Sequence, residues 1–539
     1  MTTTAMDAGS PGRPHLEQKT HGLGAIIFGL VLVGALCFVG YSIFQDTRSV
    51  GEPLAIGAFG LLGLALLIAL GFEFVNGFHD TANAVATVIY THSLPPMFAV
   101  VWSGVFNFLG VMVSTGAVAY SIVTLLPVEL ILQVGSGAGY AMIFSLLLAA
   151  IIWNLGTWWL GIPNSSSHAL IGSVMGVGLA NQLMAPAGQA TSGVDWSQAT
   201  KIIQALLFSP LVGFAASAIL LLVMKFIIRN KTLYEAPKSG DPPPWWIRGI
   251  LIFTCTSVSF AHGGNDGQKG MGLIMLILIG VAPTAYALNR TMPDSSVPAF
   301  IAAAHEAGSV FAARAKGAAP QPIIIAKAEI GEALKTKKVD QPVVYSALGV
   351  VTQDIAGQLQ AFGGLRKAPA AATPNLRNEL YMTGEALRLL GKSPTAEFTP
   401  AESKSLKDFQ GLMQKGTRFI PTWVKIVVAI ALGLGTMVGW KRIVVTVGER
   451  IGKTHLTYAQ GMAAETVAAI TIGASELYGL PVSTTHILSS GVAGTMAANG
   501  SGLQWSMVRS IATAWVLTLP AAIALAGGLY FVLRHVLVR

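Results

Sequence analysis

Charge is scarce in this chain of 539 residues: Asp, Glu, Lys and Arg make up 11% of it, against roughly 25% in an ordinary soluble domain. Hydrophobic residues account for 53%, and the mean hydropathy is +0.62. Residues 131–194 contain no charged side chain at all, which is long enough for two or more bilayer crossings at about 20 residues each. The composition excludes a soluble domain and predicts an all-α integral membrane protein.

Cysteine is scarce as well. Cys37 and Cys255 lie in separate apolar runs, so they provide neither a disulfide framework nor a set of metal ligands. The net charge of +9 comes from basic residues dispersed between apolar segments, which indicates cytoplasmic loops and no nucleic-acid partner. The apolar run 23–44 is too long for the core of a cleaved signal peptide and follows a polar tail, so we expect an uncleaved first span.

A polar segment interrupts the apolar region that begins at residue 54. It reads Phe74-Val-Asn-Gly-Phe-His-Asp-Thr-Ala-Asn83. A carboxylate at membrane depth costs a few kcal/mol or more, so its presence usually indicates a function. The pattern recurs 186 positions later in Phe260-Ala-His-Gly-Gly-Asn-Asp-Gly-Gln-Lys269, which aligns Asp80 with Asp266. The recurrence predicts a duplicated fold in which each polar segment breaks a helix.

A second pair of segments lies 318 positions apart: Gly161-Ile-Pro-Asn-Ser-Ser-Ser-His168 and Gly479-Leu-Pro-Val-Ser-Thr-Thr-His486. A proline and hydroxyl side chains ahead of an apolar stretch are typical of a re-entrant hairpin whose tip caps a helix. The two offsets differ by 132 positions, and the polar region 289–420 supplies an insertion of that size. Four separated matches explained by one insertion indicate two repeats.

Loop charge predicts that the repeats are inverted. Residues 122–139 contain no Lys or Arg, whereas the matching loop 441–453 contains four of them, so the second-half loops are expected inside and the first-half loops outside. We expect about ten transmembrane helices plus two re-entrant hairpins in two inverted-topology repeats. The predicted organisation is a polar tail (1–21), an extra first transmembrane helix (22–45), the first repeat (54–228), a basic cytoplasmic linker (229–248), the second repeat in two parts (249–288 and 421–533), a probably periplasmic polar insertion between them (289–420) and a C-terminal tail (534–539).

The hairpin hydroxyls are candidate substrate ligands. Inverted repeats with broken helices are the architecture of secondary transporters, which bind substrate near the membrane midplane. Helix N-termini attract tetrahedral oxyanions such as phosphate. Hydroxyls in membrane helices also bond to nearby carbonyls, but two clusters at repeat-related positions favour binding, and His168 and His486 directly behind them are expected to support the tips. The clusters are Ser165, Ser166 and Ser167 in the first repeat and Ser483, Thr484 and Thr485 in the second.

The two aspartates are candidates for the coupling site, because a carboxylate at midplane depth can take a proton or bind a cation. The alternative is a structural pair, since Lys269 lies three residues from Asp266 on the same helical face; Lys269 could instead touch the anion. Glu73 is a candidate proton carrier. For Glu465 and Glu476 the sequence favours a functional role and a water-facing position at a helix end equally. Neutral ligands are expected from Asn76, Asn83, Asn265 and Gln268.

Residues 72–84, 163–168, 261–270 and 481–486 resemble the signatures of the Pit family of inorganic phosphate transporters, most closely its bacterial low-affinity, proton-coupled members. The resemblance implies a non-enzymatic symporter of the bacterial inner membrane. Its substrate would be phosphate in a neutral complex with a divalent metal such as magnesium, carried together with a proton, with no permanently bound cofactor. Sodium-coupled relatives build the phosphate site from the hairpin hydroxyls and from residues that match Asp80, Asn83 and Asp266.

The sequence departs from the sodium-type pattern at His79, which replaces an asparagine, and at Gln268-Lys269, which replace Ala-Asn. These changes remove amide ligands, so they favour a proton over sodium. Asp80 and Asp266 are the expected metal and coupling-ion ligands. The sequence leaves these alternatives: a sulfate or other oxyanion permease, a sodium-coupled transporter and an anion channel. A homodimer is also possible. A serine hydrolase built on Ser167 and His168 is disfavoured, because neighbours on one helix do not easily form a nucleophile and base.

Overall fold

The computed structural model describes residues 14, 16, 22–51, 54–188, 190–237 and 240–537, except for the side chains of residues 78–83. Every regular element in these ranges is a helix. Seven of the described helices are long and apolar enough to cross a membrane, including α1 (Gly22–Ser49), which precedes the repeats. The predicted all-α, multi-pass membrane protein is confirmed.

Five helices in each half correspond in order. The first repeat ends with a proline-containing helix, as does the second, with Pro210 and Pro520 at matching places. With α1, these helices make eleven long elements. This number roughly agrees with the expected ten or so transmembrane helices plus two re-entrant hairpins. The first repeat contains α2 (Ile56–Tyr90), α3 (Pro96–Val113), α6 (Gly137–Trp159), α7 (Ser166–Leu183) and α8 (Trp196–Ile227), and the second contains α9 (Trp245–Val281), α16 (Thr422–Val445), α17 (Tyr458–Leu477), α18 (Thr484–Asn499) and α19 (Trp505–Leu537).

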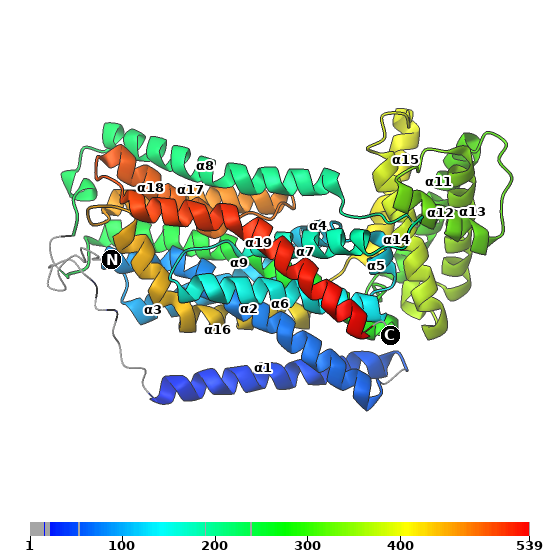
Figure 1. Cartoon of the computed structure of the whole chain (residues 1–539), viewed down its shortest axis with the longest axis horizontal. Helices are drawn as coiled ribbons and strands as arrows, with labels where there is room; N and C mark the ends of the chain where they lie inside the picture. Colours follow the sequence, from blue (N-terminus) through cyan, green and yellow to red (C-terminus); the bar gives the residue numbers. More distant parts are fainter. Residues whose placement is uncertain are drawn as a thin grey trace.

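The repeats exchange partners. Helix α2 packs along α16 and α3 packs along α9, so the first helix of each repeat lies on the second helix of the other (Figure 1). Glycine permits both crossings: Gly110 lies against the Phe260 carbonyl, and Gly435 against the Phe74 carbonyl. Small residues let membrane helices approach this closely, because a Cβ atom would overlap the partner backbone.

Two hairpins enter from opposite ends of the helix bundle. The end of α7 returns to the region where α6 begins, and Asn181 Nδ2 donates to Glu129 Oε1 there (3.0 Å). The start of α17 lies beside the end of α18, because Gln460 Nε2 donates to the Thr495 carbonyl (3.4 Å) and to Ser501 Oγ (3.3 Å). Each hairpin therefore begins and ends at one end of the bundle, as inverted repeats require. Helix α6, expected as a separate span, is the entering arm of the first hairpin.

The two polar segments do not break their helices, in contrast to the prediction. The backbone of α2 is helical from Ile56 to Tyr90, residues 78–83 included, and that of α9 is helical from Trp245 to Val281. Neither segment contains proline, and a continuous helix satisfies its own backbone hydrogen bonds in a membrane. The polar side chains are accommodated by neighbouring helices.

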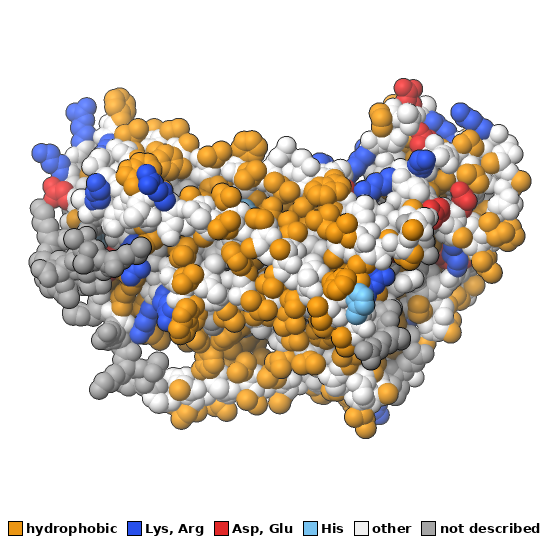
Figure 2. Space-filling view, viewed as in Figure 1, with side chains coloured by type: hydrophobic (Ala, Val, Ile, Leu, Met, Phe, Trp, Pro, Cys, Tyr) orange, Lys and Arg blue, Asp and Glu red, His pale blue; other side chains and the backbone are white. Residues whose placement is uncertain are grey.

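Residues 283–417 form a helical insertion with its own apolar core, which includes Phe300, Phe311 and Phe409. It lies at the end of the bundle opposite the linker between α8 and α9 (Figure 1). Figure 2 shows apolar side chains over the middle of the molecule and Lys and Arg side chains gathered at both ends. The insertion contains α10 (Pro283–Tyr286), α11 (Val297–Arg314), α12 (Ile323–Thr336), α13 (Pro342–Phe362), α14 (Thr373–Leu390) and α15 (Pro400–Thr417).

We expect Gly110→Val to lower the midpoint of thermal unfolding in detergent, because its side chain would overlap the Phe260 carbonyl and overpacking costs about 1–3 kcal/mol. Gly60→Val is the matched control, since Gly60 is exposed on α2 with open space around it. Equal unfolding midpoints for the two variants would contradict the close crossing of α3 and α9.

Candidate functional site

The two hairpin tips begin α7 and α18 in the same way. Ser165 is the N-cap of α7, and its Oγ accepts a hydrogen bond from the His168 backbone N–H (3.1 Å). Ser483 is the N-cap of α18, and its Oγ accepts from the His486 backbone N–H (3.2 Å). The hydroxyl clusters therefore form two equivalent helix N-termini, each with a positive dipole end.

The tips meet inside the bundle. Ser167 Oγ donates to the Val482 carbonyl of the opposite tip (2.6 Å), and the rings of His168 and His486 lie 4.6 Å apart between centroids. Trp515 of α19 packs on His486 at 4.1 Å. Two helix N-termini that enter from opposite ends thus converge on one buried region.

Helix α9 brings an ion pair next to the tips. Lys269 Nζ lies 2.7 Å from Asp266 Oδ2, and His262 Nε2 lies 3.4 Å from the same oxygen. His262 Nδ1 is in turn 2.5 Å from Asn107 Oδ1 on α3. Asp266 and Lys269 are 0% and 1% exposed, so the lysine neutralises a carboxylate that would otherwise be isolated at membrane depth.

The two amides of α9 have different surroundings. Gln268 is fully engaged: Nε2 donates to the Gly264 carbonyl (2.7 Å) and to Glu476 Oε1 (3.1 Å), and Oε1 accepts from the Val118 N–H (2.9 Å). Asn265 Nδ2 donates to the Leu480 carbonyl at the second tip (3.1 Å). Gln268 therefore joins α9 to α4 (Ala117–Val123) and α17, whereas Asn265 faces the tip region.

Helix α2 contributes Glu73 and Asn76, both fully buried. Asn76 Nδ2 donates to Glu73 Oε2 (3.4 Å), and the Glu73 carboxylate lies against Gly270, next to Lys269 in α9. The predicted ligands Asp80 and Asn83 lie outside the described side chains; only their helical backbone positions are given.

Buried polar atoms without a hydrogen-bond partner gather on these elements. An unpaired buried donor or acceptor costs about 1–3 kcal/mol, so several on these packed helices indicate a place for a polar ligand. Ser166 and Thr485 are also buried, and both have interaction partners. Among the residues whose side chains are described, the unpaired atoms of this region are Glu73 Oε1, Asn76 Oδ1, Asn265 Oδ1, Asp266 Oδ1, Thr484 Oγ1 and His486 Nε2.

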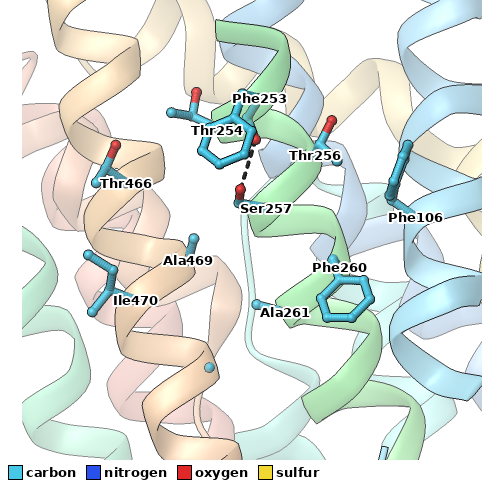
Figure 3. Close-up of a pocket in the computed structure, with 11 residues that line it drawn as sticks. Phe106, Phe253, Thr254, Thr256, Ser257, Phe260, Ala261, Thr466, Ala469 and Ile470 are labelled. Carbon is cyan, nitrogen blue, oxygen red and sulfur yellow. Dashed lines mark hydrogen bonds between the residues drawn. The ribbon is translucent and has the colours of Figure 1, made fainter. Parts of the chain in front are cut away.

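The sequence did not identify the surroundings of Glu465. This carboxylate is fully buried on α17 and accepts hydrogen bonds from the hydroxyls of Thr87 on α2 and Thr254 on α9 (2.5 Å for Thr254). An apolar groove of about 550 Å³ lies outside it between α9 and α17, and Thr254 lines it together with Phe253, Phe260 and Ile470 (Figure 3). The aromatic lining is exposed, and none of the described hairpin-tip residues lines the groove.

The fold and the site define a multi-pass membrane protein with inverted repeats and a buried polar site between them. The model of the phosphate transporter family matches residues 76–526. The chain therefore belongs to the phosphate transporter family, and it is an inorganic phosphate transporter of the bacterial inner membrane.

Curated relatives match along most of the chain. The low-affinity inorganic phosphate transporter PitB of Escherichia coli K12 is 40% identical over 486 residues, which covers 88% of this chain and 96% of the relative. A probable low-affinity inorganic phosphate transporter of Bacillus subtilis is 30% identical over 475 residues, covering 88% and 97%. A solved structure titled "The sodium-dependent phosphate transporter" is 18% identical, with a TM-score of 0.49, and covers 88% of this chain and all of its own. The curated relatives are named as transporters, not enzymes.

Removing one partner of the Asp266–Lys269 pair should destabilise the protein by about 3–5 kcal/mol, because an uncompensated buried charge remains. We expect Lys269→Gln to lower the thermal unfolding midpoint strongly and the Asp266→Asn/Lys269→Gln double variant to recover part of the loss. Lys404→Gln is the control, because its pair with Asp408 is exposed. Strictly additive effects of the two single substitutions would contradict a coupled pair.

Proposed function

We propose that this phosphate transporter imports phosphate by alternating access, coupled to protons, with the substrate a neutral complex of phosphate and a divalent metal such as magnesium. The observation that carries the proposal is the set of unpaired buried polar atoms where two helix N-termini meet. Hydroxyls and helix ends suit a tetrahedral oxyanion without adding a fixed charge that would prevent release. Membership of the family supports phosphate as that oxyanion.

We give the predicted substrate ligands different roles according to their contacts. Thr484 Oγ1 and Asn265 Oδ1 have no partner among the described residues. We assign the Thr484 hydroxyl as a donor to a phosphate oxygen, and the Asn265 amide oxygen as an acceptor from a phosphate O–H or as a ligand of the accompanying cation. Gln268 is committed to Gly264, Glu476 and Val118 and positions α9. The remaining proposed ligands are the caps Ser165 and Ser483, the tip residues Ser166, Ser167 and Thr485, and Asn83 and Lys269.

Lys269 and Asp266 link substrate binding to coupling. Lys269 compensates the Asp266 carboxylate. Phosphate would draw Lys269 toward itself, and Asp266 would then need a proton or a cation, because an unpaired carboxylate is costly at this depth. We assign this coupling role to Asp80 and Asp266, with Glu73 and Asn76 beside them, and the same two aspartates would contact a metal carried with phosphate.

The opposed hairpins support alternating access. The site residues Asn265, Asp266 and Lys269 are at most 1% exposed, and the Ser167–Val482 hydrogen bond joins the two tips. Because each hairpin enters from a different end, withdrawal of one tip opens the site toward one end only. Transporters with inverted repeats switch between two such openings.

Counterflow in proteoliposomes tests the coupling. With the insertion facing outward, we expect an inward proton gradient to drive accumulation of labelled phosphate, a sodium gradient not to drive it, and magnesium to increase it. Asp80→Asn and Asp266→Asn should each abolish gradient-driven accumulation, whereas Asp408→Asn on the exposed surface should not.

Normal accumulation by both aspartate variants would refute the coupling assignment. Accumulation driven by a sodium gradient would show that sodium, and not a proton, is the coupling ion. Flux that ignores both gradients would indicate a channel. Equal competition by sulfate would indicate a general oxyanion permease.

Thr484→Val tests direct contact with phosphate. It removes one hydroxyl while keeping the side-chain shape, and a hydrogen bond to a charged ligand contributes about 1.5–3 kcal/mol, so the half-saturating phosphate concentration should rise roughly tenfold or more. Thr495→Val on the same helix is the control, because its hydroxyl donates to the Val492 carbonyl. Identical saturation curves for Thr484→Val and the wild type would show that the tip is only structural.

A further inference from the structure

A small cavity lies between the membrane helices and the insertion. Its volume is about 50 Å³, enough for about one small anion or one to two waters by volume. One wall is formed by α4 and α9, through Tyr120, Gly272 and Met275. The other is formed by Arg377 of the insertion and by Arg418, which directly follows the insertion. The cavity is distinct from the hairpin tips and from the apolar groove of Figure 3.

One face of α9 connects this cavity with the transport site. Asn265, Lys269, Gly272, Leu276 and Ile279 follow one another at spacings of three and four residues, so they lie on the same side of the helix. The first two belong to the polar site, and the last three line the cavity. Gly272 is one turn beyond Lys269, about 5 Å along the helix axis.

Arg377 brings an uncompensated charge to the cavity. It is 7% exposed, and its Nη1 donates to the Ile131 carbonyl (3.2 Å) and to Asn378 Oδ1 (3.0 Å). No carboxylate of the described residues forms an ion pair with it. Burial lowers the pKa of Arg377 from its usual value, yet arginine stays protonated in proteins. A buried cation without an anionic partner indicates a place for an anion.

Arg418 adds a second guanidinium group. It lies over the Tyr120 ring at 5.5 Å, as Arg377 lies over the Tyr381 ring at 5.1 Å. The acid nearest Arg418 is Glu385, at 4.0 Å, but Arg388 holds that carboxylate at 2.7 Å. The rings fix both guanidinium groups by cation–π contact and leave N–H donors available.

The other charged side chains beside the cavity are paired with one another. Arg388 also pairs with Asp195 at the start of α8 (2.7 Å). Burial alone would raise the pKa of Asp195, but Arg388 holds that pKa below its usual value. Arg377, Arg388 and Arg418 therefore face two carboxylates, which leaves an excess of positive charge at the cavity.

We propose that this cavity is a recruitment site for inorganic phosphate, in which Arg377 and Arg418 bind the anion on its path between the insertion side and Lys269. The inference rests on the proposed phosphate import and adds a second binding step to it. Guanidinium groups suit phosphate because they form paired, charge-assisted hydrogen bonds with its oxygens. The apolar remainder of the lining strengthens that attraction by excluding water.

Phosphate uptake by the full-length protein in proteoliposomes, with the insertion facing outward, tests the proposal. We expect Arg377→Gln and Arg418→Gln each to raise the half-saturating phosphate concentration roughly tenfold with the maximal rate unchanged, because each removes a charge-assisted contact. Arg377→Lys should give a smaller increase. Arg366→Gln is the matched control, because Arg366 is an exposed insertion arginine away from the cavity, and it should behave like the wild type.

Three results would overturn the inference: unchanged half-saturation in both glutamine variants, an equal shift in Arg366→Gln, or a lower maximal rate at unchanged half-saturation with a lower unfolding midpoint. The last would identify the arginines as structural clamps. If Arg377→Gln does not assemble, Arg418→Gln carries the test, because Arg418 is 31% exposed. Failure of the wild type to take up phosphate would overturn the transport function itself, whereas normal wild-type uptake with unaffected variants would overturn only the recruitment site.

Discussion

The buried ion pair between Asp266 and Lys269 is the interaction on which the centre of the molecule depends. Helix α9 carries a carboxylate where a charge is least tolerated, and a lysine one turn away compensates it at 2.7 Å. With that charge compensated, α9 remains a continuous helix through the polar segment and presents Asn265 to the hairpin tip. In the proposed transport cycle the same lysine would leave Asp266 for phosphate, so this contact would serve both stability and function.

The hairpin tips complete this centre with almost no formal charge. Ser165 and Ser483 satisfy backbone N–H groups at the starts of α7 and α18, and the Ser167 hydroxyl reaches across to the other tip. The two helix N-termini therefore bring donors to the site, and Lys269 compensates the Asp266 carboxylate. In the proposed binding mode, such a site would hold an oxyanion by oriented hydrogen bonds more than by net charge, which suits a substrate that must leave again.

The repeated motifs made much of this predictable. The paired segments at Gly161 and Gly479 indicated two hairpins, loop charge indicated that the repeats are inverted, and the difference between the two repeat offsets located the insertion. The continuous course of α2 and α9 was not predictable, because polar residues in a membrane helix are also typical of breaks, and only neighbouring helices decide between the two. The role of α6 as a hairpin arm escaped for a similar reason: its hydropathy equals that of a full span.

The contacts of individual side chains were also predictable only where they depend on local sequence. Capping by Ser165 and Ser483 follows from local sequence, so it could be predicted. The burial of Glu465 between Thr87 and Thr254, the full engagement of Gln268 and the convergence of Arg377 on α9 depend on contacts between segments far apart in the chain. No local sequence pattern predicts these long-range contacts.

The exchange of partners between the repeats has a consequence for how the chain is made. Helix α2 can pack on α16 only after the whole insertion has been synthesised, and α3 can pack on α9 only after the first repeat is complete. The glycine-containing faces of α2 and α3 therefore have no partner helix when the first repeat enters the membrane. Contacts between distant segments form slowly. The contacts of α2 with α16 and of α3 with α9 therefore form only after the later helices are made, so the interlocked core is completed late.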